Sequence, residues 1–283
     1  MDTTREHLSA VDTAIIDLAL AEDIGSGDLT ARVIPEPKLA TALLTTRENM
    51  VVCGAAWFDA VFARLGSAVS SEWFVADGDE VMAGTRLCRL HGQARALLTG
   101  ERTALNLLQT LCGTATRARR FANAVAGTGC RILDTRKTLP GLRLAQKYAV
   151  RCGGCFNHRK GLYDGILIKE NHILAAGSIA QAVAAARALK SGVTIEVEVE
   201  SLPELLQALE AEVERILLDN FDLTMTREAV AVTAGRAQLE ASGNVDLGTI
   251  RELAETGVDF ISVGGLTKNV QAVDLSLRIR LDE

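Results

Sequence analysis

The segment Thr194-Ile195-Glu196-Val197-Glu198-Val199 is followed by a helical pattern at 203–211 and then by Arg215-Ile216-Leu217-Leu218-Asp219. Both apolar runs are short and rich in Ile, Val or Leu, which favours buried strands. A strand, a helix and a second strand in this order predict two parallel strands, because parallel neighbours need a crossover connection.

The same rhythm extends outward through the chain after residue 129. Further strands are predicted at 131–133, 165–168, 237–239 and 259–263, and further helices at 179–189 and 247–256. Each predicted strand ends in a polar residue or a glycine: Asp134, Lys169, Glu198, Asp219, Ser242 and Gly264. This pattern predicts an α/β barrel, whose interior is packed and whose chemistry lies at the carboxyl ends of its strands. The alternative, an open doubly wound sheet, would gather functional residues at one switch point.

The first hundred residues predict a smaller, separate sheet domain. Helical spacing at 11–21 is followed by predicted strands at 40–46 and 50–53, a helix at 57–65 and a hairpin at 77–90. Residues 99–125 then predict a helix, with an expected break at Gly113. A chain of 283 residues is long enough for two modest domains.

Composition narrows the function classes. The formal net charge is −6, so no global basic field attracts nucleic acid. No run reaches the roughly 18 apolar residues of a membrane span. The N-terminal segment carries Asp2, Glu6, Asp12 and Asp17, unlike a secretory signal. We therefore predict a cytoplasmic protein that contacts neither nucleic acid nor membrane.

Six cysteines are scattered along the chain, and only Cys152 and Cys155 have C-x-x-C spacing. A structural zinc site would need a second pair. We favour reduced, buried thiols over a metal or redox role for this pair.

Basic residues gather at predicted strand ends of this acidic chain. Asp134-Thr135-Arg136-Lys137-Thr138 follows one strand, Asn157-His158-Arg159-Lys160 lies before the next, and Lys169 ends that one. A solvated surface is the alternative, but this clustering favours an anion-binding cavity. Arginine suits carboxylates because its planar fork binds both oxygens.

Two acidic residues end the next strands. Alternation puts Glu196, Glu198 and Glu200 on one face, which is unusual for a strand buried on both sides. Glu198 and Asp219 could together hold Mg²⁺ against a pyrophosphate, or they could form structural salt bridges with the lysines.

The last two predicted strands end in glycine-rich turns. Barrels often bind phosphate after their final strands, where glycine lets backbone N–H groups approach closely. The candidate phosphate-binding residues are Ser242, Gly243, Asn244, Gly264, Gly265 and Lys268. A basic pocket, an acidic pair and a phosphate cradle predict transfer of a phosphorylated sugar, without identifying its acceptor.

These motifs resemble the quinolinate phosphoribosyltransferases, a family of type II phosphoribosyltransferases. The resemblance runs in the family's order from about residue 22 to residue 277. The matching segments are 100–106, 134–138, 153–159, 167–172, 196–200, 218–221, 240–244 and 260–264. The chain departs from the family at Lys268-Asn269, where many relatives have histidine, and at Cys155, where a small residue such as glycine is expected.

The resemblance implies a two-domain subunit. An N-terminal α/β sandwich over 1–110, joined by 270–283, precedes an incomplete, seven-stranded α/β barrel over 111–269. It also implies a homodimer with a shared active site, in which Arg102 reaches the partner's barrel.

The implied reaction converts quinolinate and phosphoribosyl pyrophosphate into nicotinate mononucleotide, pyrophosphate and carbon dioxide, within NAD biosynthesis. The implied quinolinate-binding residues are Arg102, Arg136, His158, Arg159 and Lys169. The implied catalytic residues are Lys137, Lys169, Glu198 and Asp219, the last two also serving Mg²⁺. Two alternatives remain open at this point. One is a nicotinate or nicotinamide phosphoribosyltransferase on the same barrel, and the other is a non-catalytic barrel that binds phosphorylated sugars.

Overall fold

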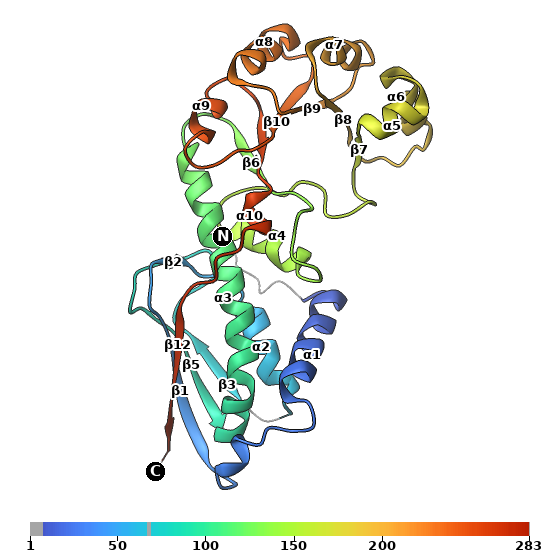
Figure 1. The fold of residues 1–283 in the computed structure, drawn as a ribbon. Coiled ribbons are helices and arrows are strands. Elements are labelled where there is room, and N and C mark those ends of the chain that lie inside the picture. The colour runs from blue at the N-terminus through green and yellow to red at the C-terminus, as the bar shows by residue number, and fades with distance from the viewer. Residues whose placement is uncertain (1–7, 67–68, 283) are drawn as a thin grey trace. The chain divides into compact units, whose positions relative to one another are not determined.

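The structure is a computed structural model that describes residues 8–66 and 69–282 (Figure 1). It divides into two compact units. The first comprises Met1–Arg119, Thr138–Gly154 and Asn269–Glu283, and the second comprises Arg120–Lys137 and Cys155–Lys268. The long helix α3 (Ala94–Ala124) runs from the first unit into the second.

The first unit is built on an antiparallel sheet in the order β12-β1-β5-β3. Its strands are β1 (Leu39–Thr46), β3 (Ser70–Trp73), β5 (Arg86–Gln93) and β12 (Leu275–Leu281). Alternate residues of β1 are buried, because successive side chains of a strand point to opposite faces. The last strand returns to the first, with Ala42 opposite Ile279. Two short strands, β2 (Met50–Val51) and β4 (Glu80–Val81), form a separate antiparallel pair.

Helices supply the second layer of the first unit, which makes it an α/β sandwich (Figure 1). The helical segments are α1 (Ala10–Ile24), η1 (Ala31–Val33), α2 (Ala55–Arg64), α4 (Arg143–Cys152) and the first part of α3. Ile16 of α1, Phe58 of α2 and Leu108 of α3 pack in one core with Leu44 of β1. Burying such side chains contributes about 1.5–3 kcal/mol each, before the entropy of ordering them is counted.

The expected break at Gly113 is wrong, because α3 continues through it as one helix of 31 residues. A side chain at Gly113 would collide with the backbone carbonyl of Gln271. The glycine therefore permits the C-terminal segment to pass close to the helix on its way to β12.

The second unit is a parallel sheet in the order β6-β11-β10-β9-β8-β7. Its strands are β6 (Arg131–Leu133), β7 (Ile166–Ile168), β8 (Ile195–Val199), β9 (Arg215–Asp219), β10 (Gln238–Ser242) and β11 (Phe260–Ser262). A single parallel bridge joins Phe156 to Leu133 of β6 and supplies a seventh strand position. Since β11 pairs with β6, the sheet curves round as an α/β barrel that stays open, within the described residues, between Phe156 and β7.

Helices follow the strands of this barrel. They are α5 (Glu170–Ala176), α6 (Ile179–Ala188), α7 (Leu202–Glu210), α8 (Leu223–Thr233), α9 (Ile250–Ala254) and α10 (Gly265–Lys268). Ser201 caps α7 two residues after β8, and Asp222 caps α8 three residues after β9. These early caps turn the chain sharply at the carboxyl ends, so the last residues of β8 and β9 lie at the edge of the sheet. Along the described chain, no helix has the length and apolarity needed to cross a membrane.

Candidate active site

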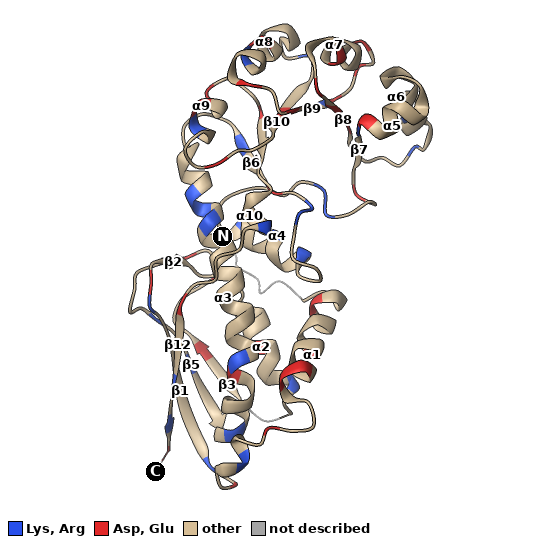
Figure 2. Cartoon of the chain, in the orientation of Figure 1, with Lys and Arg blue, Asp and Glu red and all other residues tan. Residues whose placement is uncertain are grey.

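The candidate residues that end strands lie along the carboxyl edge of the parallel sheet. Every paired strand of the second unit runs in the same direction, so their carboxyl ends share one edge. Figure 2 shows acidic residues along β8 to β10 and basic residues on the loop that leads to β7. At the carboxyl edge, Lys169 after β7 and Glu198 near the end of β8 bring opposite charges together.

Lys169 and Glu198 are joined by an ion pair. Lys169 Nζ donates to Glu198 Oε2 at 2.5 Å. The Lys169 side chain is 41% exposed, whereas that of Glu198 is 10% exposed. The pair thus joins a partly exposed ammonium group to a nearly buried carboxylate. It is one of the structural salt bridges with a lysine that the sequence analysis gave as an alternative to a Mg²⁺ site.

Asp219 lies close to Glu198 in the sheet. Glu198 is the register partner of Leu217, so Asp219, two residues further along β9, faces the same side. Asn220 adopts a left-handed backbone conformation with φ of 57°, and its side-chain amide donates to Asp219 Oδ2 at 2.8 Å. Hard carboxylate oxygens on adjacent strands are ligands that Mg²⁺ accepts, so the donor set of Glu198 and Asp219 fits that ion.

The loop after β6 is held from within the barrel. Asp134 is fully buried and accepts hydrogen bonds from the Asn157 side-chain amide at 2.6 Å and the His158 backbone N–H at 3.0 Å. This carboxylate therefore ties the 134–138 loop to the 157–160 loop, the two basic segments of the sequence.

Lys137 extends toward the last glycine turn. Its backbone carbonyl accepts a hydrogen bond from the Thr267 hydroxyl at 2.8 Å. A Cβ built on Gly264 would lie 3.1 Å from Lys137 Cδ, so the lysine stem runs across this glycine. The absence of a side chain at Gly264 leaves the space that the Lys137 stem occupies.

His158 faces two buried glutamates inside the barrel. His158 Nε2 lies 3.0 Å from Glu196 Oε2 and 3.6 Å from Glu240 Oε1. His158 Nδ1 accepts a hydrogen bond from the backbone N–H of Arg159 at 2.7 Å. Both ring nitrogens therefore have partners within the protein, so the imidazole orients the backbone that leads to Arg159.

Burial and the neighbouring charge of Glu196 raise the pKa of Glu240 to about 8. Glu240 is thus protonated at neutral pH. Sequence reasoning missed this cluster of His158, Glu196 and Glu240. The alternation in β8 was a signal for Glu196, since a charge facing a barrel interior needs a partner.

Arg159 lies at the opposite end of β7 from Lys169. Its Nη1 donates to the backbone carbonyl of Gly165 at 3.2 Å, just before β7 begins. Burial and, to a smaller extent, the charge of Arg136 lower the pKa of Arg159. A pocket of about 280 Å³ is lined here by Asn157, His158, Arg159, Lys160, Asp164, Gly165, Ile166, Thr194, Glu196 and Arg215.

The turn after β10 is shaped by its glycine. Ser242 is the register partner of Asp219, and Gly243 follows with φ of 114°. A side chain at Gly243 would collide with the side-chain oxygen of Asn220. A pocket of about 550 Å³ includes Gly243 and Asn244 in its lining. Gly264 follows β11, and Gly265 begins α10, at whose end Lys268 is exposed.

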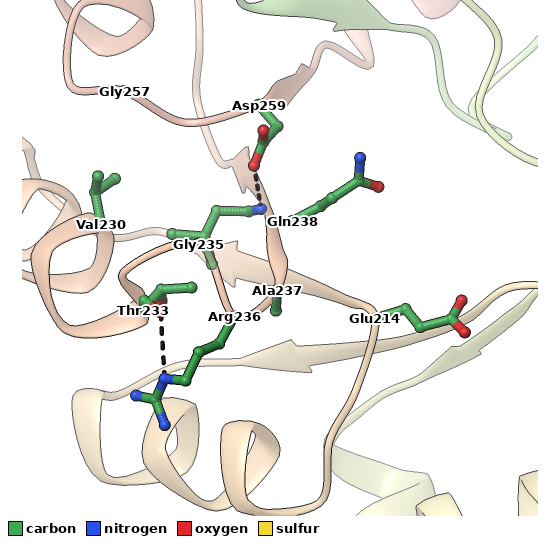
Figure 3. A pocket seen from close by; sticks show the side chains of 10 residues that line it. Glu214, Val230, Thr233, Gly235, Arg236, Ala237, Gln238, Gly257 and Asp259 are labelled. Atoms are coloured by element: carbon green, nitrogen blue, oxygen red, sulfur yellow. Dashed lines mark hydrogen bonds between the residues drawn. The ribbon is translucent and has the colours of Figure 1, made fainter.

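Another pocket, of about 510 Å³, lies at the amino ends of β9 to β11 (Figure 3). Asp259 Oδ2 accepts the Leu239 backbone N–H at 2.8 Å, and Arg236 Nε donates to the Thr233 carbonyl at 3.3 Å. These side chains fasten the loops of that edge, whereas the candidate residues at strand ends occupy the other edge.

Both units match families of known proteins. The model described as "Quinolinate phosphoribosyl transferase, N-terminal domain" matches residues 28–112, and the corresponding C-terminal domain model matches residues 114–278. The chain belongs to the quinolinate phosphoribosyltransferase family.

Individual relatives in this family cover nearly the whole chain. A "Probable nicotinate-nucleotide pyrophosphorylase [carboxylating]" of Bacillus subtilis is 42% identical over 92% of this chain and 90% of its own length. A chloroplastic "Nicotinate-nucleotide pyrophosphorylase [carboxylating]" of Oryza sativa is 40% identical over 94% of this chain and 77% of its own. The structure of the nicotinate-nucleotide pyrophosphorylase from Francisella tularensis superposes with a TM-score of 0.94 at 45% identity, covering 99% of this chain and 100% of that one.

Membership in the quinolinate phosphoribosyltransferase family confirms the predicted fold class, an α/β sandwich with an incomplete α/β barrel. Arg102, the remaining predicted substrate residue, lies on α3 within the first unit, where its side chain is exposed. The other predicted residues all belong to the second unit.

Proposed function

We propose that this chain is an enzyme, a decarboxylating quinolinate phosphoribosyltransferase. It would convert quinolinate and phosphoribosyl pyrophosphate into nicotinate mononucleotide, pyrophosphate and carbon dioxide, in the biosynthesis of NAD. The names of its relatives support this proposal. The observation that carries it is the exposed ammonium of Lys169 paired with Glu198 at the carboxyl edge, next to the strand that ends in Asp219.

Two arginines suit a doubly negative acceptor. Arg136 and Arg159 carry like charges, and after burial the charge of Arg136 is the next cause that lowers the pKa of Arg159. A dicarboxylate bound between them would neutralise both charges, and a guanidinium group can bind both oxygens of one carboxylate. His158 supports the same region through its hydrogen bond to the Arg159 backbone. A monocarboxylate such as nicotinate would neutralise only one of the two charges.

The carboxyl edge suits the phosphorylated sugar. Glu198 and Asp219 would hold Mg²⁺, which would offset the negative charge of the pyrophosphate when bound. Besides the metal ion, the positively charged side chains of Lys169 and Lys137 would stabilise the negative charge of the departing pyrophosphate. The 5′-phosphate would bind at the glycine turns, through residues Ser242, Gly243, Asn244, Gly264, Gly265 and Lys268.

Positioning and fixed charge account for the chemistry. The bond from ribose C1 to the pyrophosphate oxygen breaks, and the bond from the pyridine nitrogen to C1 forms. The ring nitrogen thereby becomes positive. The C2 carboxylate then leaves as carbon dioxide, and the electron pair left at C2 is stabilised by the adjacent nitrogen until a proton replaces it. Lysines near the departing pyrophosphate and arginines holding the acid contribute orientation and electrostatic stabilisation.

A homodimer is part of this proposal. The exposed side chain of Arg102 would enter the partner subunit's active site and add a third arginine for the acid. A cytoplasmic location also stays a prediction.

The direct test is an assay with quinolinate, phosphoribosyl pyrophosphate and Mg²⁺, with nicotinate mononucleotide quantified by chromatography. We expect product that requires all three. Replacing quinolinate with nicotinate should yield little product, and Arg159→Ala should reduce quinolinate turnover far more than any nicotinate turnover. Folded protein that forms no nicotinate mononucleotide from quinolinate would refute the proposal.

A further inference from the structure

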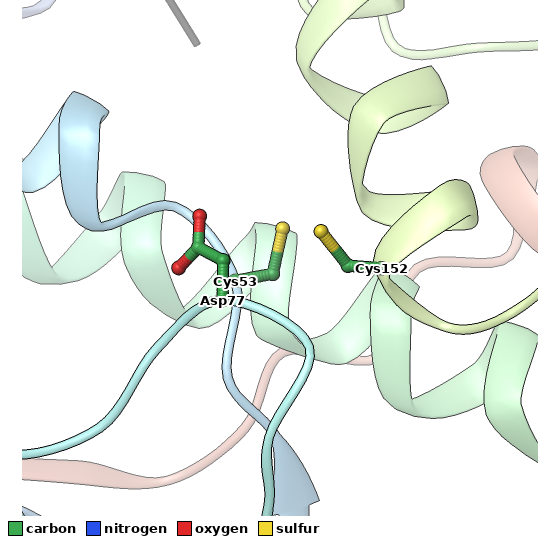
Figure 4. A group of neighbouring side chains, drawn as sticks. All are labelled: Cys53, Asp77 and Cys152. Atoms are coloured by element: carbon green, nitrogen blue, oxygen red, sulfur yellow. The ribbon is translucent and has the colours of Figure 1, made fainter. Parts of the chain in front are cut away.

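A pair of thiols lies in the first unit, and neither thiol has a role in the proposed reaction. Cys53 follows β2, and Cys152 ends α4. The sulfur atoms of Cys53 and Cys152 and an oxygen of Asp77 all lie within 4.8 Å of one another. Figure 4 shows the two sulfur atoms pointing toward each other from different segments of the chain. The spatial neighbour of Cys152 is thus a residue 99 positions away.

Asp77 is already engaged in structural hydrogen bonds. Its Oδ2 accepts the Gly54 backbone N–H at 3.0 Å and the Tyr148 hydroxyl at 2.9 Å. Its Oδ1 accepts the Ala55 backbone N–H at 3.3 Å. The carboxylate therefore satisfies the beginning of α2 and fastens α4 to it. Because these oxygens are occupied, we assign the reactivity of the cluster to the thiols and not to a metal ion.

The two thiols differ in a way that suits sequential roles. Cys53 is fully buried, and burial raises its pKa well above the ordinary value. Cys152 is partly exposed, and a hydrogen bond from Cys53 lowers its pKa, with help from the positive charge of Arg151. A partly exposed thiol whose pKa is lowered, with the sulfur of a second cysteine close by, is the arrangement found in oxidation-sensitive thiol pairs.

We propose that Cys53 and Cys152 form a reversible disulfide when the protein meets hydrogen peroxide. The Cys152 thiolate attacks a peroxide oxygen and breaks the O–O bond, which gives a sulfenic acid and, after protonation, water. The Cys53 sulfur then attacks the Cys152 sulfur, its proton goes to the departing hydroxide, and a second water leaves. Two thiols are oxidised by two electrons, and one peroxide is reduced to two waters. A small-molecule thiol reverses the reaction by exchange.

The bond would fasten the C-terminus of α4 to the beginning of α2. Arg136 and Lys137 precede α4 in the chain, and His158 and Arg159 follow it. The disulfide would therefore restrict the helix that connects the two basic segments of the sequence. The formation of the bond itself does not depend on the proposed catalytic function.

Peptide mass spectrometry tests this proposal on the whole, folded protein. After treatment with a few equivalents of hydrogen peroxide and blocking of remaining thiols, we expect a cross-linked peptide joining Cys53 to Cys152. The count of free thiols in denatured protein should fall from six to four, and a reducing agent should restore it. Unchanged thiols, or oxidation of Cys152 to a sulfinic acid without a cross-link, would overturn the proposal.

Serine variants supply the controls. Cys152→Ser changes a partly exposed position and should abolish both the cross-link and the thiol loss. Cys112→Ser is the matched control, because Cys112 also contacts Cys53: its Sγ accepts a hydrogen bond from the backbone N–H of Cys53 at 3.3 Å. This variant should keep the cross-link. Cys155→Ser should keep it as well, and a cross-link from Cys152 to Cys155 in the parent protein would contradict the assignment.

Discussion

Lys169 and Glu198, which come from neighbouring parallel strands, form an ion pair in which the lysine is exposed and the glutamate is nearly buried. A carboxylate in this position holds the ammonium group in place and leaves it exposed to solvent. The pair therefore presents a preorganised positive charge at the edge where Asp219 also lies.

Removal of the Lys169 ammonium should slow catalysis more than it weakens folding. We expect Lys169→Ala to reduce kcat/KM by about 10²–10³, the usual effect of losing one group that stabilises charge in a transition state. Lys169→Arg should retain more activity than the alanine variant. The measurement is steady-state release of pyrophosphate with thermal unfolding as the control, and an alanine variant with ordinary rates would contradict this role.

The acidic pair should govern the requirement for Mg²⁺. In Glu198→Gln and Asp219→Asn, one ligand charge is lost, so a higher Mg²⁺ concentration should be needed for half-maximal rate. Chelation of the metal should stop turnover in the parent protein, and added Mg²⁺ should restore it. A Glu210→Gln variant on α7 is a suitable control, because its side chain lies outside the site. Equal Mg²⁺ requirements in all four proteins would rule out this pair as the metal ligands.

Gly243 should tolerate no side chain. Gly243→Ala places a methyl group against Asn220 in a backbone conformation with φ of 114°. We expect a loss of about 1–3 kcal/mol in the free energy of unfolding and a raised KM for phosphoribosyl pyrophosphate. Gly235→Ala shares a positive φ but has open space around it, so it should affect stability alone. Denaturant unfolding and substrate titration would separate the two effects.

Glu240 should make stability depend on pH. In the folded chain Glu240 keeps its proton up to about pH 8, whereas an ordinary glutamate loses it near pH 4.5. Between these values the folded state binds more protons, so this residue's contribution to the free energy of unfolding falls as pH rises. The slope is at most about 1.4 kcal/mol per pH unit.

Glu240→Gln removes this dependence, because glutamine mimics the protonated acid and cannot ionise. The stability of the variant relative to the parent should therefore increase from about pH 5 to about pH 8. Denaturant unfolding at several pH values checks this expectation. Parallel stability curves for both proteins would show that Glu240 ionises normally in the folded state.

The shared active site can be tested by subunit mixing. Arg102→Ala and Arg159→Ala should each be nearly inactive as homodimers. If Arg102 acts in the partner's site, unfolding and refolding an equal mixture should restore activity to about one quarter of the parent level, because half the dimers then contain one intact site. Mixtures as inactive as the separate variants would exclude the shared site.

Much of the fold followed from local patterns. Short apolar runs separated by helical spacing predicted the parallel strands, and each predicted strand of the second unit is found. Their ends were less certain, because β10 continues through Ser242, three residues beyond the predicted end. Hydrogen bonds to β9, with Ser242 opposite Asp219, extend the strand where the apolar pattern has already stopped.

Long-range contacts were beyond local patterns. Gly113 was predicted to interrupt α3, yet the helix continues because the glycine accommodates the returning segment at Gln271. The segment Thr138–Gly154, which follows the first barrel strand, belongs to the first unit, where Ala145 and Ala149 join its core. The proximity of Cys152 to Cys53 is also a long-range contact that local sequence patterns do not predict.

The sequence by itself determined the strand and helix rhythm, the charged residues at the strand ends and the family to which they belong, because these features depend on residue type and spacing along the chain. Only the tertiary structure decided that Lys169 pairs with Glu198, that His158 is held by Glu196, and that Glu240 is buried beside them. Such partners come from strands distant in the sequence, and burial and charge interactions depend on separations in space.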